Sequence, residues 1–158
     1  MEELFVGNSI ILLFWVYISF IIEVEEKSKE IIVANTLNRK FEELREEIVE
    51  HLIQLNNYHS KFLEMLSENK SNQTIAQNFC ADTGIDCSPQ ASRDSVQKLK
   101  ISCFNEISSR KEIINCELHT KFEKFNIDRT KQDRIYFFPG RQGIHEGKII
   151  VKHIGKHL

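Results

Sequence analysis

The sequence predicts a mainly α-helical protein: an N-terminal transmembrane or signal helix, a long antiparallel helical hairpin that resembles a coiled coil, and a small C-terminal β-ribbon. Three observations predict this fold class. An uncharged apolar run lies near the N-terminus, two long segments repeat apolar residues at helical spacing, and the C-terminal segment places aromatic and β-branched residues around Pro and Gly. The expected parts are residues 1–24, 25–127 and 128–158.

The first element is the apolar, uncharged run of residues 4–22. A helix of about 20 residues crosses the roughly 30 Å hydrocarbon core of a bilayer, so this run predicts a single-pass membrane protein. A cleaved signal peptide is the alternative, and it would release a secreted helical signalling or binding module. The acidic start at Glu2 and Glu3 and the lack of a small-x-small cleavage site favour an uncleaved signal-anchor.

The side of the membrane on which the larger part lies stays open. Lysines and arginines flank the run only on its C-terminal side, which favours the cytoplasm by the positive-inside rule. Four cysteines and two glycosylation sequons, at Asn69 and Asn72, favour the outside. Together the features lean toward an extracytoplasmic glycoprotein.

The four cysteines are candidates for disulfide bonds if the compartment is oxidising. Cys80 and Cys87 bracket a short loop. Cys103 and Cys116 lie on one expected helix about 20 Å apart, which is too far for a bond between them. Full pairing would therefore join each of these two to Cys80, to Cys87 or to another chain, and Cys103 also fits as a reduced core residue.

Residues 31–66 carry the clearest helical pattern, with apolar residues at alternating steps of three and four. The expected helix runs from about residue 25 to residue 68. Its seam is expected to carry association with a protein partner or a second copy, or to pack on the second helix of the same chain. The seam residues are Phe41, Leu44, Ile48, Leu55 and Phe62.

A polar, cysteine-containing connector at residues 69–92 has the composition of turns and irregular chain. A second helix is expected from residue 92 to about residue 125, because apolar residues recur there at a spacing close to 3.6. Two amphipathic helices joined by this connector predict an antiparallel hairpin.

The C-terminal segment is expected to form a β-hairpin. "RIYFF" and "KIIVKHI" have strand composition, and they flank the turn-rich "PGRQGIHEG". A short basic amphipathic helix on a membrane or partner is the alternative. Basic residues dominate from residue 129 onward, so this end is expected to neutralise the acidic first helix or to contact anionic lipid. No nucleic-acid partner is expected.

"DTG" at residues 82–84 resembles the signature of aspartic proteases, in which two carboxylates share a proton. The surrounding residues depart from that signature, so a turn is expected here. The cysteines and histidines lack the spacing of a zinc site, and no phosphate-binding loop or nucleophile elbow is present. We therefore expect no catalytic activity, metal or cofactor. The predicted function is protein–protein interaction, as a tether, spacer or assembly subunit.

Overall fold

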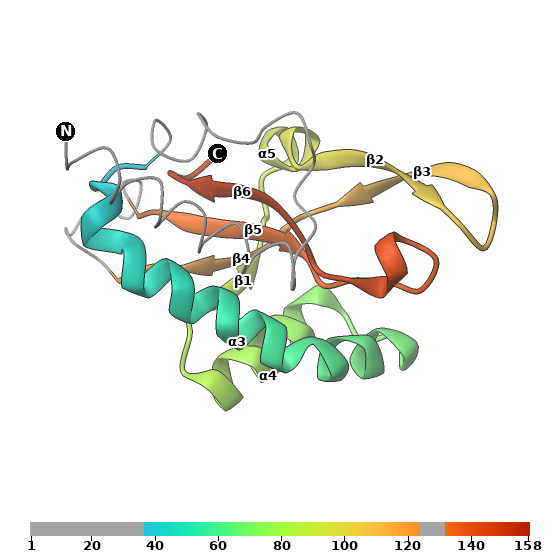
Figure 1. Ribbon diagram of the computed structural model, residues 1–158, viewed down its shortest axis with the longest axis horizontal. Coiled ribbons are helices and arrows are strands. Elements are labelled where there is room, and N and C mark those ends of the chain that lie inside the picture. Colours follow the sequence, from blue (N-terminus) through green and yellow to red (C-terminus); the bar gives the residue numbers. More distant parts are fainter. Residues whose placement is uncertain (1–36, 124–131) are drawn as a thin grey trace, which may run out of the picture.

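The computed structural model describes residues 37–123 and 132–158 (Figure 1). Within these residues the chain forms three α-helices, one short 3-10 helix, and six strands in two antiparallel sheets. In chain order the elements are α3 (Phe41–Ser67), α4 (Asn72–Thr83), β1 (Cys87–Pro89), α5 (Arg93–Lys98), β2 (Lys100–Asn105), β3 (Arg110–Asn115), β4 (Leu118–Lys121), β5 (Arg134–Phe138), η3 (His145–Gly147) and β6 (Ile150–Gly155).

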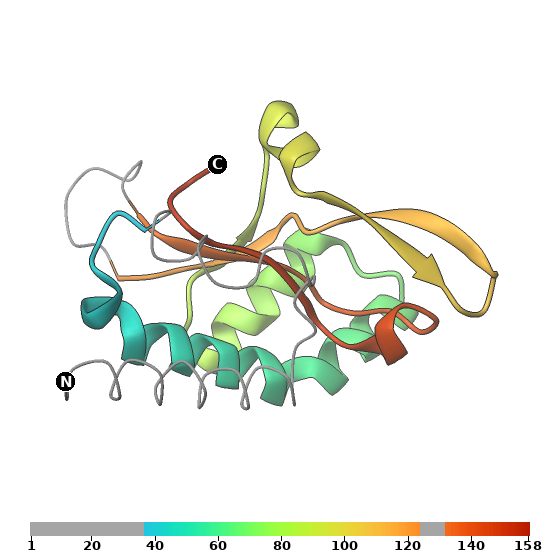
Figure 2. The same cartoon turned by 45° about the horizontal axis from the view of Figure 1, so that its top comes forward.

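The larger sheet has the strand order β1-β4-β5-β6, and α3 and α4 cover one of its faces (Figures 1 and 2). Successive side chains of a strand point to opposite faces of the sheet. In β5, Ile135 and Phe137 join the core beneath the helices, whereas Arg134 and Tyr136 lie on the other face. The result is a two-layer arrangement with one apolar and one polar sheet face.

The apolar stripe of α3 forms most of the core between the layers. Phe62 lies 5.5 Å from Phe79 of α4 and 5.8 Å from Phe137 of β5, measured between ring centroids. These distances are within the range of favourable aromatic contacts. Four of the predicted seam residues are fully buried here, and Phe41 packs at the edge, half-buried; the four are Leu44, Ile48, Leu55 and Phe62.

Local capping explains why part of the expected connector is helical. The Ser71 side chain accepts a hydrogen bond from the backbone N–H of Thr74 and caps the start of α4. Gly84 ends the helix at a φ of +77°, which only glycine adopts without strain. The "DTG" segment is therefore the C-terminal end of α4, where Asp82 accepts a hydrogen bond of 2.7 Å from the Tyr58 hydroxyl.

The predicted fold class, a mainly α protein with a long helical hairpin, is wrong. The segment expected as the second helix forms α5, β2, β3 and β4 instead. Burial alternates at every residue of β2, which is the period of a strand. β-Branched residues that lie off the helical spacing favour the strands, and these are Ile101 and Ile113.

The membrane and coiled-coil predictions are corrected as well. In residues 37–123 and 132–158, no helix is long and apolar enough to cross a membrane, which overturns the predicted single-pass membrane localisation. The apolar run at residues 4–22 lies outside the described residues. The predicted coiled coil is also wrong for the described residues, because α3 packs within its own chain on the larger sheet and on α4.

At the C-terminal end, β5 and β6 pair in antiparallel fashion, with a bulge between Tyr136 and Phe137. They are not a separate ribbon, because β5 also pairs with β4 in the larger sheet. The apolar residues of β6 join the core beneath the helices through Val151 and Ile154.

Candidate functional site

The hairpin of β2 and β3 extends beyond the larger sheet at one end of the molecule (Figures 1 and 2). Its inner face is anchored, because Cys103 and Ile114 are buried against Ile144. Near its tip, the backbone N–H of Glu106 donates a 2.7 Å hydrogen bond to the carbonyl of Gly143. The loop after β5 therefore supports this hairpin from one side.

The hairpin exposes apolar side chains. Phe104 is 55% exposed, Ile107 74% and Ile113 70%, and they are the only exposed large hydrophobic side chains among the described residues. Phe104 and Ile113 lie on the outer face, whereas Ile107 lies at the tip beside Gly143. Phe104 lies opposite Lys111 in the register. Four cations on or beside the hairpin have no ion-pair partner in the described part of the chain. We call the three exposed apolar residues and these four basic residues together the hairpin patch: Phe104, Ile107, Ile113, Lys98, Lys100, Arg110 and Lys111.

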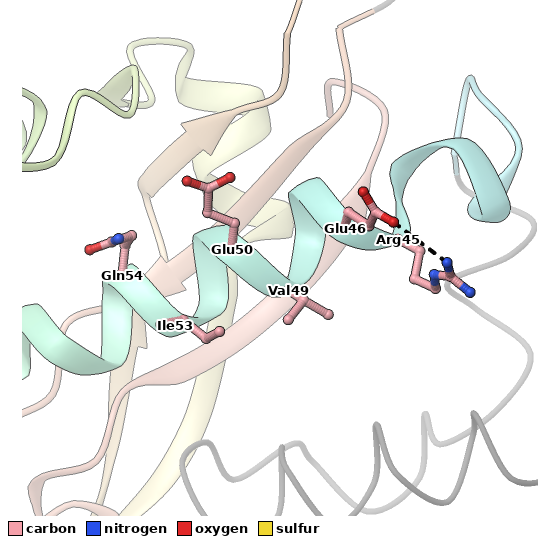
Figure 3. Close-up of a pocket in the computed structure, with 6 residues that line it drawn as sticks. All are labelled: Arg45, Glu46, Val49, Glu50, Ile53 and Gln54. Carbon is pink, nitrogen blue, oxygen red and sulfur yellow. Dashed lines mark ion pairs between the residues drawn. The ribbon is translucent and has the colours of Figure 1, made fainter.

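A second feature is an open pocket of about 500 Å³ along the surface of α3 (Figure 3). Val49 and Ile53 are half-buried and form its apolar part. Glu46 and Glu50 are exposed beside them, and in the described part of the chain only Glu46 has an ion-pair partner, Arg45, at 3.7 Å. We call this surface the α3 groove; it combines an apolar strip with acidic side chains.

A third feature is a polar cavity of about 430 Å³ on the sheet face that the helices do not cover. It lies over the neighbouring strands β1, β4 and β5, whose outward-facing residues line it. The cavity is lined by Asp86, Ser88, Pro89, Gln90, Ala91, His119, Lys121, Gln132, Arg134 and His157.

Arg134 is the main charged group inside this cavity, and its side chain is buried. Its Nη1 donates to Nε2 of His119 at 3.2 Å and to the Tyr136 hydroxyl at 3.4 Å. Its Nε is buried and has no hydrogen-bond partner. Buried polar groups of native proteins nearly always have partners, so this nitrogen needs an explanation.

His119 takes a defined protonation state beside Arg134. Burial, followed by the charge of Arg134, lowers the pKa of His119 to about 3, so its ring is neutral at pH 7. The guanidinium can only donate, so Nε2 of His119 is the acceptor and Nδ1 carries the proton, facing the Glu117 carbonyl at 3.5 Å. Ser88 donates its hydroxyl to the same Nε2 at 3.2 Å.

The residues predicted for association and modification lie elsewhere. The seam residues of α3 are inside the core, as described above. None of the four cysteines forms a disulfide bond among the described residues, which corrects the disulfide prediction. Burial raises the pKa of the Cys87 thiol to about 12. Of the two predicted glycosylation sites, Asn69 is exposed at a φ of +57°. The Asn72 amide donates a hydrogen bond of 2.5 Å to the Glu117 carboxylate, which a glycan on Asn72 would break. The glycoprotein prediction is not retained.

Sequence reasoning missed both the hairpin patch and the polar cavity. A period of two in "KISCFN" was the available signal for the hairpin, because it separates Phe104 from the buried Cys103. The signal for the cavity was an arginine at the start of the apolar strand "RIYFF", where a charge on a central strand needs a partner.

In comparisons with protein-family models, curated proteins and solved structures, no match to this chain was found. Among the described residues, no group of three or more His, Cys, Asp or Glu side chains is placed to hold a metal ion.

Proposed function

We propose that this chain is an assembly subunit that associates head to tail, with the hairpin patch of one copy on the α3 groove of the next. The observation that carries the proposal is that every exposed large hydrophobic side chain of the described residues lies on one hairpin. Exposed apolar side chains gathered on one element are typical of an interaction site.

Charge selects the occupant of the hairpin patch. Lys100 and Lys111 share the outer face with Phe104, and Arg110 adds a third cation near the tip. Glu106 is the one exposed acid of residues 100–115, so two hairpin patches would still repel one another in a symmetric contact. The α3 groove offers the complement, since Glu46 and Glu50 border Val49 and Ile53 (Figure 3). Apolar contact would supply most of the affinity, and the charges would fix the orientation.

A contact between two different surfaces of the same chain is heterologous. Such contacts close into rings or continue as open chains, depending on the rotation between successive copies. The proposal therefore expects association to continue beyond a dimer.

The experiment is sedimentation velocity on the full chain at increasing concentration, for wild type, Lys111→Glu and Glu50→Lys. Wild type should associate, more weakly at high salt, and each variant alone should be mostly monomeric because one of the two surfaces is reversed. A mixture of the two variants should associate again, because the unchanged hairpin patch of one meets the unchanged α3 groove of the other.

Glu64→Lys is the matched control, because Glu64 is exposed on the same helix but outside the α3 groove. It should associate like wild type. A wild-type chain that stays monomeric, or variants that associate unchanged, would overturn the proposal; so would a mixture that stays monomeric.

A further inference from the structure

Arg134 is a buried cation that no carboxylate of the described residues balances. The residue is 8% exposed, and among the described residues its Nη1 contacts only the neutral His119 ring and the Tyr136 hydroxyl. Within residues 37–123 and 132–158, no ion pair involves it, and its Nε has no hydrogen-bond partner. Burial of a charge without a counter-charge is strongly unfavourable, so proteins place one there only when something compensates it.

Two carboxylates close to Arg134 in the cavity wall or in the chain, those of Asp86 and Asp133, are already occupied. Asp86 pairs with Lys121 at the edge of the cavity, at 3.0 and 3.2 Å. Asp133 accepts hydrogen bonds from the backbone N–H groups of Asn38 and Arg39, at 2.8 and 3.3 Å. Among the side chains that line the cavity, the positive charge of Arg134 remains after the Lys121–Asp86 pair is taken into account.

Other groups that face the cavity do not cancel this charge. His119 is neutral, as described above. Burial, followed by the charge of Arg134, also lowers the pKa of His157. Ser88, Gln90 and Gln132 are uncharged, so the walls can donate and accept hydrogen bonds without neutralising the guanidinium.

We propose that this cavity is an oxyanion-binding site, in which Arg134 takes the carboxylate or phosphate group of a small molecule. A guanidinium presents a planar fork of donors that matches both groups, and the Nε of Arg134 is a donor without a partner among the described residues. The volume of about 430 Å³ is in the range of small-molecule sites. Ser88 and Gln90, from β1 and just after it, are positioned to contact the remainder of the molecule.

His119 acts as a positioning residue in this proposal. Its acceptor nitrogen holds Nη1 of Arg134 at 3.2 Å and so fixes the orientation of the guanidinium, whose Nε has no partner among the described residues. The proposal is independent of head-to-tail association, because the cavity contains no residue of the hairpin patch or of the α3 groove.

The test follows the Nε–H resonance of Arg134 by NMR in isotope-labelled full-length protein. The resonance is assigned by its disappearance in Arg134→Lys. Benzoate, phenyl phosphate and neutral benzamide are titrated separately against sodium chloride at equal ionic strength. At least one of the two anions should move the resonance saturably, and the more effective one identifies the group that the site prefers.

Two results would overturn the proposal: neither anion moves the resonance more than chloride does, or benzamide moves it as far as the anions. Arg134→Lys keeps the charge but loses the planar fork, so calorimetric affinity for the effective anion should fall by about tenfold or more. Unchanged affinity would also contradict the proposal. Arg141→Lys is the matched control, since Arg141 is exposed and pairs with Glu112 outside the cavity, and it should bind like wild type. If Arg134→Lys does not fold, the wild-type titration with its benzamide control still decides.

Discussion

The two faces of the larger sheet are built from the same strands but differ in almost every physical respect. The face beneath α3 and α4 is apolar and closed, with Ile135 and Phe137 fully buried among aromatic rings. The opposite face carries Arg134, His119 and a cavity, and one of its buried nitrogens has no partner. Strand alternation thus separates a face that stabilises the fold from a face that is available for binding.

A buried histidine on each face sharpens this comparison. His51 of α3 contacts Thr120 at 2.9 Å and packs on the Phe122 ring, so it is a satisfied member of the core. His119 lies next to Thr120 on the other face, yet it holds an arginine at the cavity. The two histidines are similarly buried, but His51 packs in the core whereas His119 positions the Arg134 side chain.

The largest expected effect comes from a charge placed in the core between α3 and the closed face of the sheet. Leu55 is fully buried in α3, so Leu55→Asp would bury an unpaired carboxylate and should cost several kcal/mol in the free energy of unfolding. Chemical denaturation measures it. Glu64→Lys on the exposed side of the same helix should stay within about 0.5 kcal/mol of wild type, and a folded Leu55→Asp of near wild-type stability would show that the closed face is not the core.

The next effect is a loss of stability in acid. Burial lowers the pKa of His51 to about 4 in the folded chain. Below about pH 6.5 the His51 imidazole is therefore protonated in the unfolded chain while it is still neutral in the folded chain. Stability from this residue is present above pH 6.5 and falls as the pH drops toward 4, by about 2 kcal/mol between pH 7 and pH 5. Denaturation at the two pH values should show a smaller loss in His51→Gln, and an equal loss would exclude His51 as a source.

The smallest expected effect on stability belongs to the hairpin patch. Phe104 is 55% exposed, so Phe104→Ser should change the melting temperature very little, while sedimentation should show weaker self-association. A large drop in melting temperature would instead indicate that Phe104 packs within its own chain.

Parts of this fold could be predicted because the relevant signal was local. The three- and four-residue spacing along α3 identified the helix and its buried side, including Leu44 and Phe62. The Pro- and Gly-rich turn between strand-like segments indicated β5 and β6. These signals depend on neighbouring residues, which sequence reasoning can assess.

The remainder could not be predicted because it depends on tertiary context. The apolar residues of β2 and β3 also fit a helical period, and only pairing of Ile101 with Ile114 resolves the choice. The seam of α3 could have met another helix, but the sheet that covers it is assembled from segments far apart in the chain. The cavity at Arg134 likewise requires β1, β4 and β5 to be adjacent.

The most direct test of the difference between the two faces compares neighbouring residues of β5, Ile135 and Arg134, by chemical denaturation. Ile135→Ala removes a fully buried core side chain and should lower the free energy of unfolding by about 2–5 kcal/mol. Arg134→Met replaces an unbalanced buried charge with an apolar side chain of similar length, so stability should be unchanged or higher. If Arg134→Met lost as much stability as Ile135→Ala, Arg134 would belong to the structural core, and the assignment of the open face to binding would be contradicted.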